Sequence, residues 1–243
     1  MDSPICKRAS IDRSPHMPNP LIALVLSLTS TLGTAPSVRY EPAGTARDQH
    51  ARKLLKDSGV LRTRLDGVEV VARGCDSPRA TWNDGKRRIT ICYSLVTKIN
   101  RTITGISETE EADSRTTPAR VDGALAALYH HQLGHALAAL NGLPGDGEQA
   151  DRFAALTLTA RDSRHVVAAA EARHLLAAHT DADHLSGTAA SATFACLLYG
   201  ADPAKYARIA KGGWVPAERA PSCRAEYDRA RSDLGSLAVK VGA

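Results

Sequence analysis

The run from Val121 to Leu140 constrains the fold of this chain most strongly, because it is rich in alanine and leucine and ends at Asn141-Gly142. Alanine and leucine favour helix, and an Asn-Gly pair commonly follows a helix end. The run therefore predicts one long helix. Only 4% of the residues are aromatic while 43% are hydrophobic, so we expect a core built largely from alanine, leucine and valine.

Two histidines lie inside this predicted helix. His131 and His135 are four residues apart, so on a helix they share a face and can bind one metal ion. In the zinc-peptidase motif HExxH, the glutamate after the first histidine is the general base for the metal-bound water. Gln132 occupies that position, and an amide can hydrogen-bond water but cannot accept its proton. The pattern predicts a metal-binding helix without its usual base.

The next predicted helix begins with acidic residues that can complete such a site. A turn after the first helix folds Asp146, Glu148 and Asp151 back towards the histidines. We expect one of these carboxylates to reach the metal as third ligand and another, Asp151, to orient a histidine ring. Gly134 costs about 1 kcal/mol against alanine in a helix interior, which indicates a close approach there. The alternative is two partly buried histidines beside an acidic helix start that the helix dipole favours.

The N-terminal segment has the order of a secretory signal. Basic residues precede an apolar stretch at 21–32, and small residues follow at 33–35. We therefore predict a signal peptide over residues 1–35 and a secreted or extracytoplasmic protein. The apolar stretch is too short to span a bilayer, and no later segment is apolar enough. A start at Met17 removes the basic region, and the segment then remains open to interpretation as an anchor or a buried helix.

Export changes how the cysteines are interpreted. It removes Cys6 and leaves four cysteines in an oxidising compartment. Chain proximity favours the pairs Cys75–Cys92 and Cys196–Cys223 among the three possible pairings. Four reduced, buried thiols are the alternative. Their spacing contains no CxxC pair, which argues against a cysteine zinc site.

The remaining sequence predicts a small β element followed by a helical body, which makes one α+β domain over residues 46–243. A linker is predicted at 36–45 and a flexible loop at 102–119. Two β-rich runs at 68–72 and 89–93 enclose an Asn-Asp-Gly turn signal, so we expect an antiparallel pair or a small sheet. Further helices are predicted at 46–57, 148–161, 164–179, 188–199, 203–211 and 224–239. The net charge of +5 comes without dense basic tracts, which predicts no nucleic-acid partner.

The segments 131–137 and 150–155 together resemble a bacterial family of putative metallopeptidases, which carries HExGHAL and ExxAD-type motifs. The likeness extends to the cysteine-containing segment 75–93 and to parts of the C-terminal half, and covers most of residues 46–235. The resemblance implies a zincin-like fold, zinc as cofactor and a secreted peptidase that acts on peptides or proteins.

The departures from that family concern its acidic positions. Gln132 replaces the catalytic glutamate, the ExxAD glutamate falls at Gly147, and Ser94 stands where the family has a glutamate. The third ligand is then displaced onto Glu148 or Asp146. Three such changes together predict impaired hydrolysis.

The resemblance also places His184 as a donor to a developing oxyanion. A solvated or capping loop histidine is the alternative at that position.

Three functions remain open at this point. The chain is a zinc peptidase in which Glu148 or Asp146 transfers the proton, a non-catalytic module that binds peptides or proteins, or a metal-free helical domain. General-base assistance is worth about 10²–10⁴-fold in rate, so Gln132 predicts a loss of that size. Loss of the third carboxylate weakens zinc binding separately, because catalytic zinc normally has three protein ligands and a water.

Overall fold

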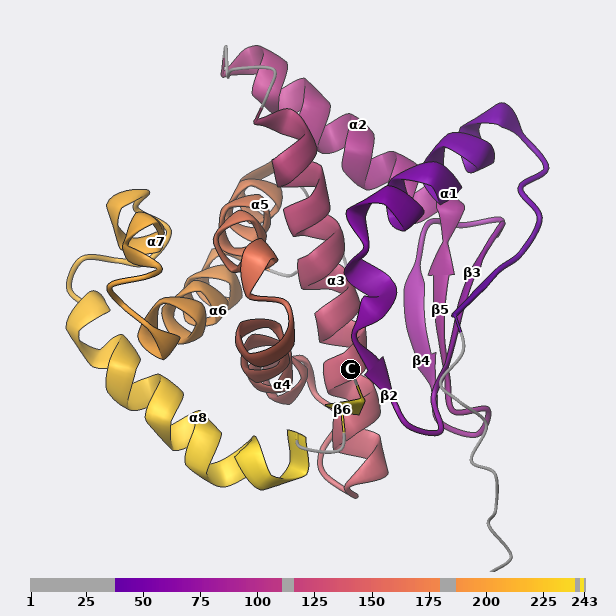
Figure 1. The fold of residues 1–243 in the computed structure, drawn as a ribbon. Helices are drawn as coiled ribbons and strands as arrows, with labels where there is room; N and C mark the ends of the chain where they lie inside the picture. The colour runs from indigo at the N-terminus through magenta and orange to yellow at the C-terminus, as the bar shows by residue number, and fades with distance from the viewer. Residues whose placement is uncertain (1–37, 111–115, 180–186, 239–240, 243) are drawn as a thin grey trace, which may run out of the picture. The chain divides into compact units, whose positions relative to one another are not determined.

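A computed structural model describes residues 38–110, 116–179, 187–238 and 241–242, which form a mixed α+β structure (Figure 1). The fold class predicted from the sequence, α+β, is confirmed at this level. The strands are β1 (Val38–Tyr40), β2 (Arg64–Leu65), β3 (Glu69–Arg73), β4 (Ala80–Asn83), β5 (Arg88–Cys92) and β6 (Val241–Gly242). The helices are α1 (Ala46–Ser58), α2 (Tyr93–Thr109), α3 (Thr117–Leu140), α4 (Gly147–Arg161), α5 (Val166–His179), α6 (Thr188–Ala201), α7 (Ala207–Lys211) and α8 (Cys223–Ala238).

The main sheet has the strand order β1-β3-β5-β4 and is mixed rather than antiparallel. The two β-rich runs found in the sequence, β3 and β5, pair in parallel, so the predicted antiparallel pairing between them is wrong. The turn signal instead connects β5 to β4, an antiparallel neighbour that the sequence analysis missed. β4 was missed for two reasons. It has only four residues, and its sequence, with Thr81 and Trp82 both partly buried, does not alternate between apolar and polar residues.

The predicted loop at 102–119 is wrong at both ends, because helix α2 continues to Thr109 and helix α3 begins at Thr117, while residues 111–115 lie outside the described residues. The buried residues Val96, Ile99, Ile103 and Ile106 of α2 recur at helical spacing, and this apolar stripe outweighs the polar composition of the segment. Val96, Ile99 and Ile103 pack into the same core as α1 and the sheet. Tertiary packing of one face therefore decides the structure here.

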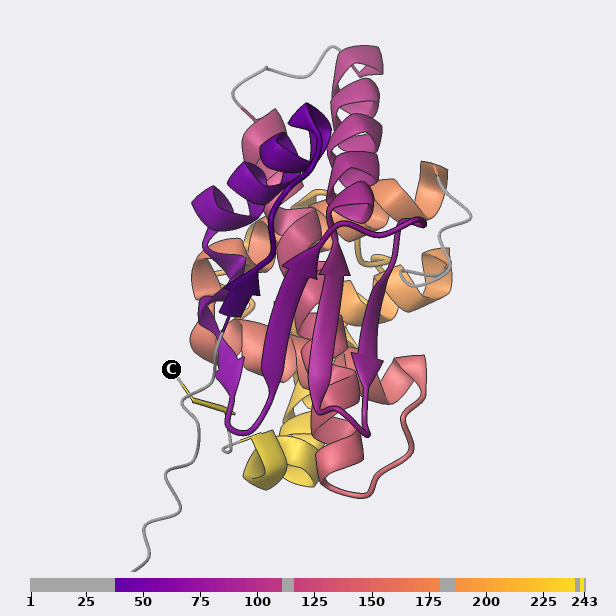
Figure 2. The same ribbon diagram turned by 90° about the vertical axis from the view of Figure 1, so that its right-hand side faces the viewer.

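Helix α3 lies between the sheet and helices α4 and α5 (Figures 1 and 2), and most of its residues are buried. Two glycines permit the close packing. A Cβ at Gly134 would lie 2.1 Å from the carbonyl oxygen of Ala150 on α4, and one at Gly123 would lie 2.2 Å from that of Ala168 on α5. The close approach predicted at Gly134 is therefore present, and it brings α4 against the histidine segment of α3.

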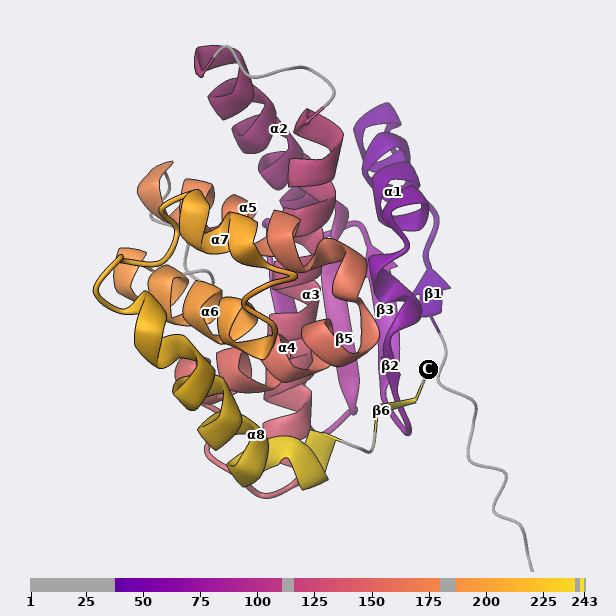
Figure 3. The same cartoon turned by 60° about the vertical axis from the view of Figure 1, so that its left-hand side comes forward.

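Both predicted disulfides are present. Cys75–Cys92 joins the loop after β3 to the end of β5, and Cys196–Cys223 joins α6 to the start of α8. The second bond fixes α8 alongside α6, where α8 also crosses α4 (Figure 3). Within the described ranges, no helix is long and apolar enough to cross a membrane.

The N-terminal predictions meet the structure only in part. The predicted signal peptide at residues 1–35 lies outside the described residues. The predicted linker at 36–45 contains β1, which pairs with β3 from Val38↔Val70 to Tyr40↔Ala72. Residues 38–40 are therefore an edge strand of the main sheet, parallel to β3, and not part of an unstructured linker.

Candidate functional site

The two histidines of α3 face each other. Their Nε2 atoms lie 3.1 Å apart, and the rings are nearly perpendicular with centroids 4.6 Å apart. His131 Nδ1 lies 2.7 Å from Oδ1 of Asp151 on α4. A carboxylate only accepts hydrogen bonds, so Nδ1 of His131 carries the hydrogen and donates. Its other ring nitrogen, Nε2, faces Nε2 of His135.

Asp151 is held from its other side by Arg173 of α5. The guanidinium donates Nη1 to Oδ1 at 2.6 Å and Nη2 to Oδ2 at 2.5 Å, and the Arg173 side chain is 1% exposed. Its guanidinium carbon also lies 4.6 Å from the ring centroid of Phe194. Burial raises the pKa of Asp151, but the hydrogen bonds from His131 and Arg173 outweigh it, and the net pKa lies below the ordinary value. The carboxylate therefore stays charged and keeps the His131 ring in one orientation.

Gln132 and Gly147 stand at the two positions where the family resemblance leads us to expect acidic residues. Gln132 follows the first histidine and is buried, with 2% of its surface exposed. Gly147 is the first residue of α4, after the N-cap Asp146. A Cβ built on Gly147 would lie 4.0 Å from Cε1 of His131 and meet nothing closer. The space beside the histidine pair is therefore left open at residue 147.

The residues present match a zinc ion in part. Two imidazole nitrogens on one tetrahedral zinc lie about 3.3 Å apart, given Zn–N bonds of about 2.0–2.1 Å. The observed separation of 3.1 Å is close to this value, and a carboxylate behind one ring is the usual support for such a ligand. Among the described residues, however, no group of three or more His, Cys, Asp or Glu side chains is placed to hold a metal ion. The donor set is thus short of a catalytic zinc site.

A cavity of about 690 Å³ opens beside His131, which is within the usual size range of ligand pockets. Residues of α3, α4, α5, α6 and α8 line it, together with Arg219 from the segment before α8. The lining residues that carry charge on α4 and α5 are Glu148, Asp151, Arg152 and Arg173, and those on and before α8 are Arg219, Glu226, Arg229 and Asp233. The charges of the two signs balance, and the small residues Ala189 and Ala190 leave the α6 side open.

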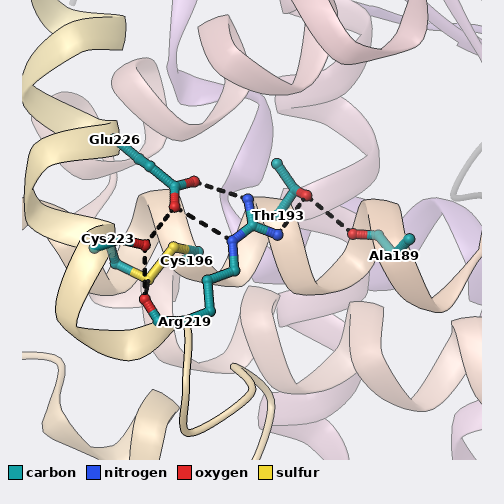
Figure 4. Close-up of a disulfide and its surroundings, with 7 residues drawn as sticks. Ala189, Thr193, Cys196, Arg219, Cys223 and Glu226 are labelled. Atoms are coloured by element: carbon teal, nitrogen blue, oxygen red, sulfur yellow. Dashed lines mark hydrogen bonds and ion pairs between the residues drawn. A yellow bond between two sulfur atoms is a disulfide. The ribbon is translucent and has the colours of Figure 1, made fainter.

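A fixed ion pair supports the α8 wall of this cavity (Figure 4). Arg219 donates Nη2 to Oε2 of Glu226 at 2.7 Å and Nη1 to Oγ1 of Thr193 at 2.9 Å. The bond to Arg219 lowers the pKa of Glu226, against the opposing effect of burial. The Cys196–Cys223 disulfide lies next to this network. The α6 and α8 walls are therefore joined covalently and by hydrogen bonds.

The sequence-predicted site residues are brought together only in part. His131, His135 and Asp151 meet, and Gln132 lies between the two histidines in the chain. Glu148 lines the same cavity, but its carboxylate binds Arg152 at 2.7 Å and its side chain is 68% exposed. His184 lies outside the described residues.

The sequence did not lead us to Arg173, and it suggested a different role for Asp146. Arg173 is a single arginine in an alanine-rich helix, and an arginine with apolar neighbours was a signal that it has a buried partner. Asp146 was considered as a ligand, but its Oδ1 accepts from the backbone N–H of Gln149 at 2.7 Å and caps α4. The helix start itself accounts for this carboxylate.

Comparison with known protein families matches residues 40–237 to a family described as "putative metallopeptidase". The match covers most of the chain, so the chain belongs to this family. No curated protein and no solved structure shows a significant match.

Proposed function

We propose that this chain is an exported, zincin-like member of the metallopeptidase family that binds a peptide or protein beside the histidine pair and is impaired in hydrolysis. One observation carries the proposal: open space at Gly147 faces His131, and Gln132 follows that histidine. In this proposal, the site lacks both a third metal donor and a general base among the described residues. Loss of the base alone corresponds to about 10²–10⁴-fold in rate.

The preserved part of the site supports a binding role. The Arg173–Asp151–His131 chain is buried and connected by hydrogen bonds at Asp151, and His131 Nε2 meets His135. With two imidazole donors, we expect zinc to bind more weakly than at a site with three protein ligands. The cavity beside the pair has the volume to take part of a peptide.

An active enzyme is the second candidate, and the position of Glu148 favours it. This carboxylate lines the same cavity as His131, so in that candidate it replaces the missing ligand or base. To do so it must give up its ion pair with Arg152, which is a weak constraint because both side chains are exposed.

Export is proposed on two independent features. The N-terminal sequence has the order of a signal peptide over residues 1–35. The two disulfides are typical of proteins that fold in an oxidising compartment.

Zinc titration of the purified protein, followed by calorimetry, tests the incomplete donor set. We expect weak binding that His135→Ala abolishes. Gly147→Glu should tighten binding by about tenfold or more, because it supplies a carboxylate beside His131. Gln149→Glu is the matched control, since it adds the same charge two residues further along α4.

The outcomes separate the candidates. If Glu148→Ala abolishes zinc binding and Gly147→Glu changes nothing, Glu148 is the third ligand and the proposed loss of the donor set is wrong. If His135→Ala leaves zinc binding unchanged, the histidine pair is not the metal site. Binding below about a tenth of an equivalent under saturating zinc would favour the metal-free domain.

A further inference from the structure

A second cavity, of about 230 Å³, lies between the first turn of α1 and the first ten residues of α2. The two helices run side by side at one end of the sheet (Figure 2). Six residues line the cavity, and none of them is acidic: Arg47, Ser94, Thr97, Lys98, Arg101 and Thr102. The cavity beside His131 and the one around Asp162 both contain carboxylates. This composition distinguishes the cavity between α1 and α2.

The lining residues of α2 form one stripe. Ser94, Thr97, Lys98 and Arg101 follow each other at spacings of three, one and three residues, so they share a face of the helix. Arg47, the second residue of α1, completes the wall from the opposite helix. The chain thus places three cations around one small hollow.

These three cations have no carboxylate within ion-pair distance among the residues the structure describes. Other basic side chains do have one: Arg88 pairs with Glu69, and Arg120 pairs with Glu171. Like charges that share a cavity repel each other, and a bound anion removes that repulsion. The start of α2 adds a favourable dipole for negative charge.

Two hydroxyl groups of the same wall are also without partners. Ser94 Oγ and Thr97 Oγ1 are buried and make no hydrogen bond in the described structure. Buried polar groups in proteins are nearly always hydrogen-bonded, and a hydroxyl can rotate to donate to a new acceptor. Cationic and hydroxyl donors together, with no competing carboxylate, are the groups that recognise phosphate and sulfate oxygens.

We propose that this cavity binds a tetrahedral oxyanion, a phosphate or sulfate group, through Arg47, Lys98, Arg101 and the hydroxyls of Ser94 and Thr97. Its volume is below the roughly 300–1,000 Å³ of small-molecule pockets, so it takes one anionic group rather than a whole organic ligand. The proposal does not depend on the histidine site or on hydrolysis.

Calorimetric titration of the folded protein with inorganic phosphate, sulfate and acetate at low ionic strength tests the site. We expect one equivalent of phosphate or sulfate to bind and acetate to bind much more weakly. Arg47→Ala and Arg101→Ala should each weaken phosphate binding by about tenfold or more. Lys211→Ala removes an exposed cation at the end of α7 and is the matched control, for which we expect no change.

Thermal unfolding with and without phosphate distinguishes a variant that has lost the anion site from one that has failed to fold. Phosphate should raise the midpoint of the wild type but not that of Ser94→Glu, because an internal carboxylate then neutralises the cations. Ser94→Glu should itself unfold at a higher temperature than the wild type in phosphate-free buffer.

A third arm uses glycerol phosphate. Tighter binding than inorganic phosphate identifies the group as part of a larger molecule, and equal or weaker binding identifies the free ion. Both results support the oxyanion site. No binding of phosphate or sulfate, equal binding of acetate, or an equal loss in Lys211→Ala would overturn it.

Discussion

His131 and Asp151 are joined by a 2.7 Å hydrogen bond between α3 and α4, and Asp151 is in turn bound by a buried arginine. This relationship fixes the orientation of one imidazole while its neighbour His135 stays within 3.1 Å. A buried carboxylate that serves both a histidine and an arginine couples the candidate site to the helix core. Changes at the site and changes in stability are therefore expected to be linked.

Arg173→Met should destabilise the protein strongly. The substitution leaves the Asp151 carboxylate buried with only His131 as its partner, and removal of one member of a buried ion pair costs about 3–5 kcal/mol. Urea unfolding measures the loss. Arg152→Met removes an exposed pair with Glu148 and should cost at most about 1 kcal/mol. Equal costs for the two variants would contradict the structural role given to Arg173.

Gly134→Ala should separate α3 from α4. The new methyl group would lie 2.1 Å from the backbone oxygen of Ala150, so one helix must shift, at a cost of about 1–3 kcal/mol. Gly105→Ala on α2 is the control, since its Cβ would meet nothing within 4 Å. That variant should gain up to about 1 kcal/mol in unfolding free energy. A stabilised Gly134→Ala would show that the helices are not in close contact.

The Arg219–Glu226 pair predicts a pH dependence. The bond to Arg219 holds the pKa of Glu226 below its ordinary value of 4.5, so its contribution to stability is fully present above that value. The contribution is lost as the pH falls through the lowered pKa. The stability difference between wild type and Glu226→Gln should therefore shrink between about pH 6 and pH 3. Chemical unfolding across this range gives the comparison, and a difference that grows on acidification contradicts the assignment.

Loss of the second disulfide should loosen the cavity wall. Cys196→Ala combined with Cys223→Ala frees α8 from α6, and removal of a disulfide closing a loop of this length costs about 2–4 kcal/mol. Replacing Cys75 and Cys92 by alanine should cost a similar amount of stability, because the disulfide between them closes a loop of comparable length. Only the first should change hydrogen exchange at Thr193 and Glu226. Equal exchange in both variants would mean that the bond does not support this wall.

Sequence patterns predicted helices α3 to α6 and α8 to within a few residues because their signals are local, whereas α2 was missed and α7 is shorter than predicted. The alanine-rich α3 ends at Leu140 before Asn141-Gly142, and Gly142 has a positive φ of 65°. The cysteine pairs followed from their separation in the chain. Strand pairing was harder to predict. The chain runs from β3 through β4 to β5, and β4 pairs with β5 only, while β3 and β5 pair in parallel.

The candidate site was predictable for residues that lie close in sequence and less so for those brought together by packing. The spacing of His131 and His135 placed both on one helix face. Asp151 was expected as the supporting carboxylate, but nothing near it in the chain indicates Arg173, which reaches it from α5. The consequence of Gly147 depends on where its Cβ would point, and that is a property of the fold alone.

Peptide cleavage at saturating zinc tests the central claim most directly. A mixed peptide library is incubated with wild type, Gln132→Glu, Gly147→Glu and the double variant, with Gln149→Glu as control. We expect no cleavage above background by wild type or control, and a rise of about 10²-fold or more in the double variant, since it restores both base and ligand. Wild-type cleavage at a rate that neither substitution increases would contradict the account.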